Sequence, residues 1–311
     1  MTSPPALREI AHGLKFPEGP VALPNGDLLV VEIARGTLTR IEANGRTEVV
    51  AAPGGGPNGA ALGPDGKVYL CNNGGFEWVE MSGGRIRPAH QPADYSGGRI
   101  ERVDLATGQV EVLYTHGPNG PLRGPNDLVF DGHGGFWFTD LGKTRPRTLD
   151  YGGVYYARAD GSEIREVVHP MLTPNGIGLS PDGRQLYVAE TRAGRVWAWQ
   201  VEAPGQLSRE PFPMPWGARL LHQVSSYRLF DSLVVDAAGQ VCVASLMEGG
   251  ITVVAPQGGE VAFIPMPDVY TTNLCFGGPD LRTAFITLST TGRVVAMEWP
   301  RPGAPLHHLN V

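Results

Sequence analysis

Six polar side chains recur along the 311-residue chain at intervals of roughly 40 to 70 residues, each just before a short apolar run. These landmark residues are Glu18, Asn58, Asn126, Asn175, Asp231 and Asn273. Four of them, Glu18, Asn126, Asn175 and Asp231, supply two carboxylates and two amide carbonyls, which are hard oxygen donors suited to a dication such as Ca²⁺. His and Cys residues show no spacing typical of a tetrahedral zinc site. The sequence therefore predicts a site for one hard divalent cation.

Turn chemistry offers a simpler explanation of the same residues. Asn and Asp are favoured in turns because their side chains bond to nearby backbone groups. Glu18 is different, since Glu is not a turn former and the surrounding FPEGP gives it no such role. We therefore favour the metal-site interpretation.

The elements that position these residues are β-hairpins. The stretch RGPNDLVFDGHGGFWFTD has two apolar runs around a glycine-rich turn, which is typical of two paired strands. Each landmark starts a similar pair, a third run opening on glycine follows, and most units have a fourth run such as TEVVA or VEVLY. Four antiparallel strands in each of six units predict an all-β, six-bladed β-propeller. A helical turn is expected only around residues 219–226.

The repeat also predicts how the ring closes. We expect residues 1–311 to form a single domain, with blades starting near residues 18, 58, 126, 175, 231 and 273. The sixth unit ends after its third run, at Trp299, whereas the N-terminal run LREIAHG resembles a fourth strand. Residues 6–13 are therefore expected to be the outer strand of the last blade, which would remove an exposed sheet edge.

Strand direction places the landmarks at one mouth of a central channel. Two units are enlarged between their second and third runs, at residues 73–96 and 141–152, so both insertions should rise over the same mouth. Arg123, Asn73 and Asn126 are candidate substrate-binding residues there. Asn58, Asn273 and Ser232 are candidates for supporting the metal ligands.

Composition limits the classes of partner that the protein is expected to bind. The net charge of −6 without a basic cluster argues against nucleic acid. The N-terminus lacks the pattern of a signal peptide, and apolar runs stay well below the roughly 20 residues of a membrane span. The three cysteines, Cys71, Cys242 and Cys275, are expected to be buried thiols in a reducing cytoplasm.

Four segments together resemble the regucalcin/gluconolactonase, or senescence-marker-protein, family: FPEGPVALPNGDLLVVE, GPNDLVFDGHGGFWFTD, TPNGIGLSPDGRQLYVAET and FDSLVVDAAGQVCVASL. The resemblance implies a six-bladed propeller that hydrolyses lactones with one divalent metal in its channel. It implies Glu18, Asn175 and Asp231 as metal ligands, with Asn126 a ligand or a close neighbour. Ca²⁺ is the favoured ion, with Zn²⁺, Mg²⁺ or Mn²⁺ as alternatives.

The expected function is hydrolysis of a small-molecule lactone, with a sugar (aldono)lactone favoured. The cation would polarise the carbonyl while water attacks. Asp231 is the favoured general base, and the alternative is that a metal-bound water is the attacking species. One alternative is an organophosphate or phosphotriester hydrolase at the same metal. A second is a propeller that binds calcium or another ligand without catalysis.

Overall fold

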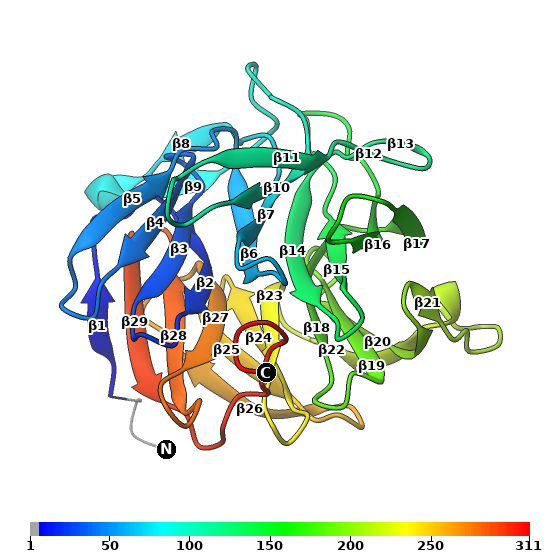
Figure 1. The fold of residues 1–311 in the computed structure, drawn as a ribbon. Coiled ribbons are helices and arrows are strands. Elements are labelled where there is room, and N and C mark those ends of the chain that lie inside the picture. The colour runs from blue at the N-terminus through cyan, green and yellow to red at the C-terminus, as the bar shows by residue number, and fades with distance from the viewer. Residues whose placement is uncertain (1–5) are drawn as a thin grey trace.

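The computed structural model describes residues 6–311, which fold into six antiparallel sheets arranged as blades around a central channel (Figure 1). This confirms the predicted all-β, six-bladed propeller. Among the described residues the only helical segments are two short 3₁₀ turns, η1 (Ser82–Gly84) and η2 (Pro215–Gly217). In each of the six sheets the innermost strand begins at or near a landmark residue, so the ring places all six landmarks at one level.

The strands follow one another from the channel outward in every blade. Blade 1 consists of β2 (Pro17–Ala22), β3 (Leu28–Glu32), β4 (Thr37–Ile41) and β5 (Thr47–Ala51). Blade 2 consists of β6 (Pro57–Leu62), β7 (Val68–Asn72), β10 (Arg99–Val103) and β11 (Val110–Tyr114). Blade 3 consists of β14 (Pro125–Phe130), β15 (Gly135–Asp140), β16 (Gly152–Arg158) and β17 (Ile164–Met171). Blade 4 consists of β18 (Pro174–Leu179), β19 (Gln185–Glu190), β20 (Arg195–Ala203) and β22 (Arg219–Gln223), and β21 (Gln206–Leu207) also pairs with β20.

Blades 5 and 6 complete the ring. They consist of β23 (Leu229–Val235), β24 (Val241–Leu246), β25 (Gly250–Val254), β26 (Glu260–Pro265), and β27 (Thr271–Gly277), β28 (Thr283–Leu288), β29 (Arg293–Glu298), β1 (Arg8–Ala11). Two small hairpins lie outside the blades: β8 (Trp78–Glu80) with β9 (Ile86–Pro88), and β12 (His116–Gly117) with β13 (Gly120–Pro121).

The expected helical turn at residues 219–226 is wrong. Arg219–Gln223 is strand β22, which pairs with β20 and supplies the fourth strand of blade 4. Leu221 is buried against Val196 and Phe230, so packing between blades 4 and 5 decides the conformation of this short apolar run. The helical turn lies just before it, at η2.

The N-terminal strand belongs to the last blade. β1 pairs antiparallel with β29, with Arg8 opposite Ala296 and Glu9 opposite Val295. Ala11 is buried in a cluster that includes Val294 and reaches Val30 in blade 1. The same strand thus completes one sheet and packs against the next.

The core lies between the blades rather than on one face of a sheet. Every residue of β3, β7 and β24 is buried, because neighbouring blades cover both faces of a second strand. Large side chains such as Trp137, Trp299 and Tyr69 fill the wedges between sheets. Such packing fixes the second strands rigidly, and the innermost strands are paired directly to them.

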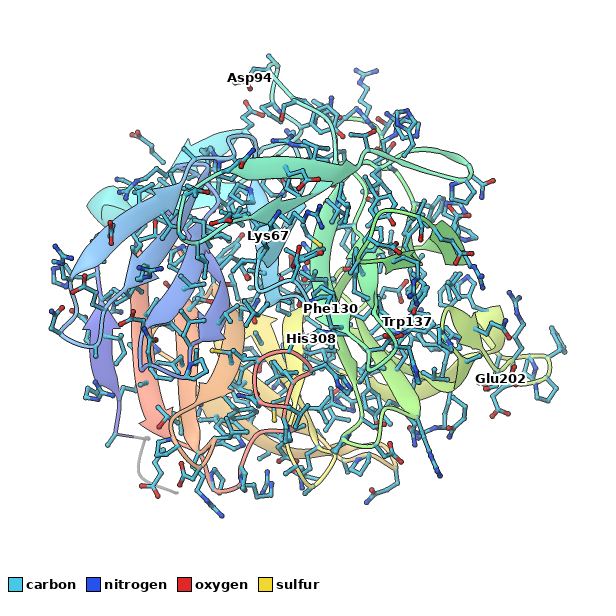
Figure 2. The ribbon with its side chains drawn as sticks, in the orientation of Figure 1. Lys67, Asp94, Phe130, Trp137, Glu202 and His308 are labelled. Atoms are coloured by element: carbon cyan, nitrogen blue, oxygen red, sulfur yellow. The ribbon has the colours of Figure 1, made fainter. Side chains whose placement is uncertain are left out.

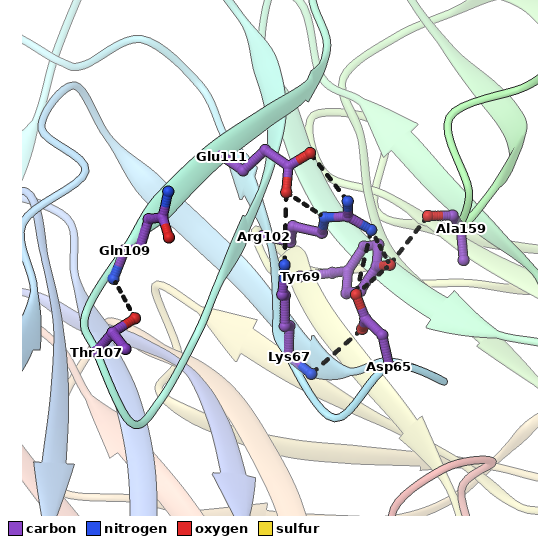
Figure 3. Close-up of polar contacts among 8 residues, drawn as sticks. All are labelled: Asp65, Lys67, Tyr69, Arg102, Thr107, Gln109, Glu111 and Ala159. Carbon is purple, nitrogen blue, oxygen red and sulfur yellow. Dashed lines mark hydrogen bonds and ion pairs between the residues drawn. The ribbon is translucent and has the colours of Figure 1, made fainter.

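A polar network joins blades 2 and 3 near their outer edges (Figure 3). Arg102 on β10 donates to both oxygens of Glu111 on β11, at 2.8 and 2.9 Å, and to Asp65 at 3.1 Å. The hydroxyl of Tyr69 donates to the carbonyl of Ala159 in blade 3 at 3.0 Å. The bidentate pair is a charge-assisted hydrogen bond that fixes the geometry of this edge.

We predict that deleting residues 1–13 lowers the melting temperature by about 10 °C or more, because blade 6 loses its outer strand and blade 1 loses a packing surface. Circular dichroism melts of the full chain and the deletion variant measure the difference. Arg8→Ala, which alters an exposed side chain of β1 and keeps the strand, is the matched control. Equal melting temperatures for the deletion variant and the full chain would contradict the role assigned to β1.

Candidate active site

A β-bulge marks the landmark position of all six inner strands. The register of each inner pair shifts there, as between Glu18 and Val21, between Pro125 and Leu128, and between Phe230 and Leu233. The same shift occurs in the inner pairs of blades 2, 4 and 6. A bulge breaks the alternation of side chains, so the landmark and the residue after it can both be directed toward the channel.

Glycine after a landmark lets neighbouring inner strands come into contact. A Cβ on Gly19 would lie 2.3 Å from the carbonyl oxygen of Asn58, and one on Gly59 would lie 2.6 Å from that of Asn126. A Cβ on Gly176 would lie 2.4 Å from the backbone nitrogen of Leu233. Larger residues at these positions would push the inner strands apart, and the landmark side chains would no longer converge.

Four oxygen-bearing landmarks meet at this level of the channel. Glu18, Asn126 and Asn175 are buried, whereas Asp231 is partly exposed at the mouth. Among residues 6–311 the buried Oδ1 atoms of Asn126 and Asn175 have no hydrogen-bond partner. A buried acceptor without a donor costs free energy, so these two oxygens are placed for a ligand.

Asn273 holds Glu18 in position. Its Nδ2 atom donates to Oε2 of Glu18 at 2.6 Å, and the backbone nitrogen of Gly19 donates to the same oxygen at 2.6 Å. Asn58 is buried at the equivalent place on β6, and Ser232, also buried, has an Oγ atom with no partner among the described residues. Asn273 thus supports a candidate ligand directly, as a hydrogen-bond donor.

Asp127 is a third carboxylate of the site that the sequence analysis did not select. Burial, together with the nearby charge of Glu18, raises the pKa of Asp127 to about 8. Burial likewise raises the pKa of Glu18 to about 7. Burial also raises the pKa of Asp231 well above its ordinary value, and the charges of Glu18 and Asp127 contribute to that increase. The three carboxylates therefore destabilise one another's charged forms, which a cation at the site would relieve.

Acidic residues at the ends of second strands hold the loops that enter the site. Asp140 accepts hydrogen bonds from the backbone nitrogens of Arg123 and Gly124, both at 2.7 Å. Glu32 and Glu190 accept in the same way from the segments before β2 and β18. These contacts fix the start of each inner strand relative to its own second strand.

The candidate substrate-binding residues differ in their surroundings. Arg123 is exposed, and only its backbone takes part in the contacts with Asp140 and with the hydroxyl of Tyr95. Asn73 is buried, its Oδ1 atom accepts from Gly75, and its Nδ2 atom has no partner within residues 6–311. Asn73 is therefore placed to donate a hydrogen bond, and the exposed guanidinium of Arg123 has no hydrogen-bond or ion-pair partner within residues 6–311.

Lys143 joins the two insertions, a role for which the sequence analysis gave no signal. It is fully buried, and its Nζ atom donates to Gly75 O at 2.6 Å and to Asn73 Oδ1 at 3.3 Å. The same atom lies 4.2 Å from the centre of the Phe76 ring. Burial lowers its pKa to about 7, although the charge of Asp140 raises it. One buried lysine thus ties residues 141–152 to residues 73–96.

A cavity of about 550 Å³ lies within the channel and extends away from the carboxylates. Asp127 and Asn273 line it near the site, and the C-terminal segment from Ala304 to Asn310 lines it at the other end of the channel (Figure 1). In Figure 2, Phe130 and His308 lie together near the centre of the ring, with ring centroids 5.3 Å apart. The C-terminal segment therefore packs against the inner strands opposite the landmark mouth.

The donor set fits a hard divalent cation. Within residues 6–311, His, Cys, Asp and Glu side chains alone form no group of three that could hold a metal. A cation site here must use amide oxygens as well, and the unpaired Oδ1 atoms of Asn126 and Asn175 supply them beside Glu18 and Asp231. This mixture of carboxylate and carbonyl oxygens is typical of Ca²⁺ and Mg²⁺ sites.

The protein is thus a six-bladed β-propeller with a candidate cation site of carboxylate and amide oxygens at one mouth of its channel. Residues 16–290 match the model of the SMP-30/Gluconolactonase/LRE-like region family. The chain belongs to this family.

Its relatives are similar over most of their length. The chain is 27% identical over 309 residues to a gluconolactonase of Zymomonas mobilis, covering 91% of this chain and 79% of the relative. It is 27% identical over 271 residues to the lactonase drp35 of Staphylococcus aureus, covering 86% and 74%. A gluconolactonase from Xanthomonas campestris has the same fold, with a TM-score of 0.74, 22% identity, and coverage of 94% and 89%. A calcium-binding regucalcin from Agrobacterium tumefaciens aligns with a TM-score of 0.73, 21% identity, and coverage of 97% and 98%.

We predict that Lys143→Met changes how stability depends on pH. The unfolded chain keeps a proton on this lysine up to about pH 10, whereas the folded chain loses it near pH 7. The unfolded state thus binds more protons in this window, so Lys143 makes the native protein more stable as pH rises, by at most about 1.4 kcal/mol per pH unit. Urea denaturation between pH 7 and 9 should show wild type gaining stability relative to the variant. The exposed Lys15→Met variant is the control, and a pH-independent difference for Lys143→Met would contradict this assignment.

Proposed function

We propose that the protein is a divalent-metal-dependent lactonase that opens a sugar (aldono)lactone with water. The observation that carries the proposal is the pair of buried, unpaired amide oxygens, on Asn126 and Asn175, beside the carboxylates of Glu18 and Asp231. Family membership and lactonase relatives support lactone hydrolysis as the reaction. The regucalcin neighbour is a calcium-binding protein, which favours Ca²⁺ among the ions that such donors accept.

Glu18, Asn175 and Asp231 would hold the cation, with Asn126 as a fourth donor or a contact to substrate. When bound, a divalent cation supplies Lewis-acid polarisation of the lactone carbonyl. Asn273 keeps the Glu18 carboxylate in one orientation through its 2.6 Å hydrogen bond. The close packing of the inner strands prevents these donors from moving apart.

Asp231 is the proposed general base because it is the partly exposed carboxylate of the group. In this role it accepts a proton from the attacking water as the water oxygen bonds to the carbonyl carbon. The ring C–O bond then breaks, the ring oxygen takes up a proton, and the hydroxy acid leaves through the mouth. Asn73 and Arg123 are proposed to donate hydrogen bonds to substrate oxygens.

The buried free thiols of Cys71, Cys242 and Cys275 accord with a protein that works in a reducing cytoplasm. Among residues 6–311, none of the helical segments has the length and apolar character needed to cross a bilayer.

We predict that Asp231→Asn lowers kcat/KM for D-gluconolactone by about 10² or more, because a positioned base typically contributes that much. Chelation with EDTA should abolish turnover, and added Ca²⁺ should restore it. A pH-indicator assay measures hydrolysis, and calorimetry of Ca²⁺ binding gives a readout that does not require turnover. Asp182→Asn, an exposed Asp in a turn away from the mouth, is the matched control.

Two outcomes would overturn the proposal. Turnover of a phosphotriester without turnover of any lactone would favour a phosphotriesterase. Binding of Ca²⁺ without hydrolysis of any ester or lactone would favour a binding protein.

A further inference from the structure

The cavity in the channel has apolar walls that the proposed lactonase reaction does not use. Its volume is about 550 Å³, within the range of roughly 300 to 1,000 Å³ that is typical of small-molecule pockets. All six inner strands line it, and Asp127 and Asn273 are the only polar residues that these strands contribute in the described chain. The other charged lining residues lie outside the inner strands, as Asp182 and Arg184 do. The middle of the cavity is therefore suited to an apolar molecule.

This cavity is distinct from the candidate cation site. None of the four residues proposed to hold the cation belongs to its walls. Asp127 and Asn273 line it at the landmark level, and the remaining walls follow the inner strands away from the mouth. A molecule bound in the cavity would therefore lie on the opposite side of the landmark level from the proposed lactone.

Asp127 offers a hydrogen-bond acceptor at the inner end of the cavity. Its side chain is 8% exposed, and the backbone nitrogen of Leu128 donates to its Oδ1 atom at 2.9 Å. The Ser232 hydroxyl and the backbone nitrogen of Ile177 lower the pKa of this carboxyl less than that bond does. A carboxylate has about four acceptor positions, so Asp127 can accept a further hydrogen bond.

Asn273, the other polar residue of the inner strands in the cavity, has no such capacity to spare. Its Nδ2 atom donates to Glu18 at 2.6 Å, and its Oδ1 atom accepts from the backbone nitrogen of Leu274 at 2.7 Å. The polar contact open to a ligand at the inner end is therefore the carboxyl of Asp127, and the matching group on the ligand is an N–H or O–H donor.

The C-terminal segment covers the outer end of the cavity. The backbone nitrogen of Ala304 donates to the carbonyl of Val235 in blade 5 at 3.0 Å. Further along the segment, the ring of His308 packs against Phe130 in blade 3, with centroids 5.3 Å apart (Figure 2). Leu306, between these two anchors, lines the cavity and is 40% exposed to solvent. The segment thus spans the channel from blade 5 to blade 3 and forms the outer wall.

We propose that this cavity is a second binding site, for a compact apolar molecule with one N–H or O–H donor at its end, such as an aromatic alcohol or amine. The donor bonds to the carboxyl of Asp127, and the apolar body lies against Ala61, Val129 and Val234, which are partly exposed walls of the cavity. Burial of the apolar body supplies most of the binding free energy, and the single hydrogen bond sets the orientation. The site goes beyond the proposed lactonase function and does not depend on it.

The carboxylates also exclude one class of ligand. Glu18, Asp127 and Asp231 lie at or near the inner end, and their negative charges disfavour an anion there. The hydroxy acid that a lactonase releases is such an anion. The proposed ligand is therefore neither the substrate nor the product of the reaction at the mouth.

The test measures binding of two probes by calorimetry: 2-naphthol, which carries one O–H donor, and 2-methoxynaphthalene, which lacks it. Wild type should bind 2-naphthol at one site, and 2-methoxynaphthalene about fivefold or more weakly, because the ether cannot donate to Asp127. Val234→Phe should weaken binding of 2-naphthol about tenfold or more, since the larger side chain occupies part of the cavity. Val112→Phe, the same change at a 51% exposed position of β11, is the matched control and should bind like wild type.

A second variant keeps the test valid if Val234→Phe fails to fold, which circular dichroism would show. Ala61→Leu enlarges a side chain on the wall contributed by blade 2 and should also weaken binding of 2-naphthol. Three outcomes would overturn the site: no binding of 2-naphthol to wild type, equal binding to wild type and the folded cavity variants, or displacement of 2-naphthol by D-gluconate. Equal binding of the two probes would overturn the contact with Asp127. Binding is measured without turnover, so a protein inactive on lactones would overturn the proposed function alone.

Discussion

The crowding of three carboxylates at one channel mouth is the constraint on which the rest of the structure depends. Glu18, Asp127 and Asp231 come from blades 1, 3 and 5, and their charges disfavour one another. Only a rigid support keeps such groups together. The support is the buried second strand of each blade, together with the bulges that turn the landmarks inward and the glycines that let inner strands touch. The stability of the hydrophobic wedges between blades thus offsets the electrostatic cost of the site.

Repetition made the fold and the landmark residues predictable from sequence. Six units with one phase identify the inner strands, and a polar residue at the same phase in each identifies the candidate ligands. Asp127 was not predicted as a site residue, because strict alternation along a strand would turn its side chain away from the channel. The bulge that redirects it cannot be recognised from a single sequence. Strand β22 was not predicted because it has too few apolar residues to distinguish a strand from a helical turn. Its contacts with the neighbouring blade decide between the two.

The insertions were located correctly, but their interiors were not predictable, because a segment without a repeat has no second copy to compare. Lys143 looks like a surface lysine in the sequence, and only the fold shows it enclosed by Gly75, Asn73 and Phe76. Residues that depend on contacts between distant segments carry no local signal of their role.

The pairing of β1 with β29 has a consequence for biosynthesis. β1 leaves the ribosome first among the described strands, yet its partner is the last strand of the last blade. The outer strand of blade 6 must wait, unpaired, until nearly the whole chain has been translated, although blades 1 to 5 can assemble as they emerge. Contacts so far apart in sequence form slowly. The nascent chain therefore carries a strand with unpaired backbone groups while the later blades are synthesised. We expect aggregation and chaperone binding of the newly made protein to be most frequent in that interval.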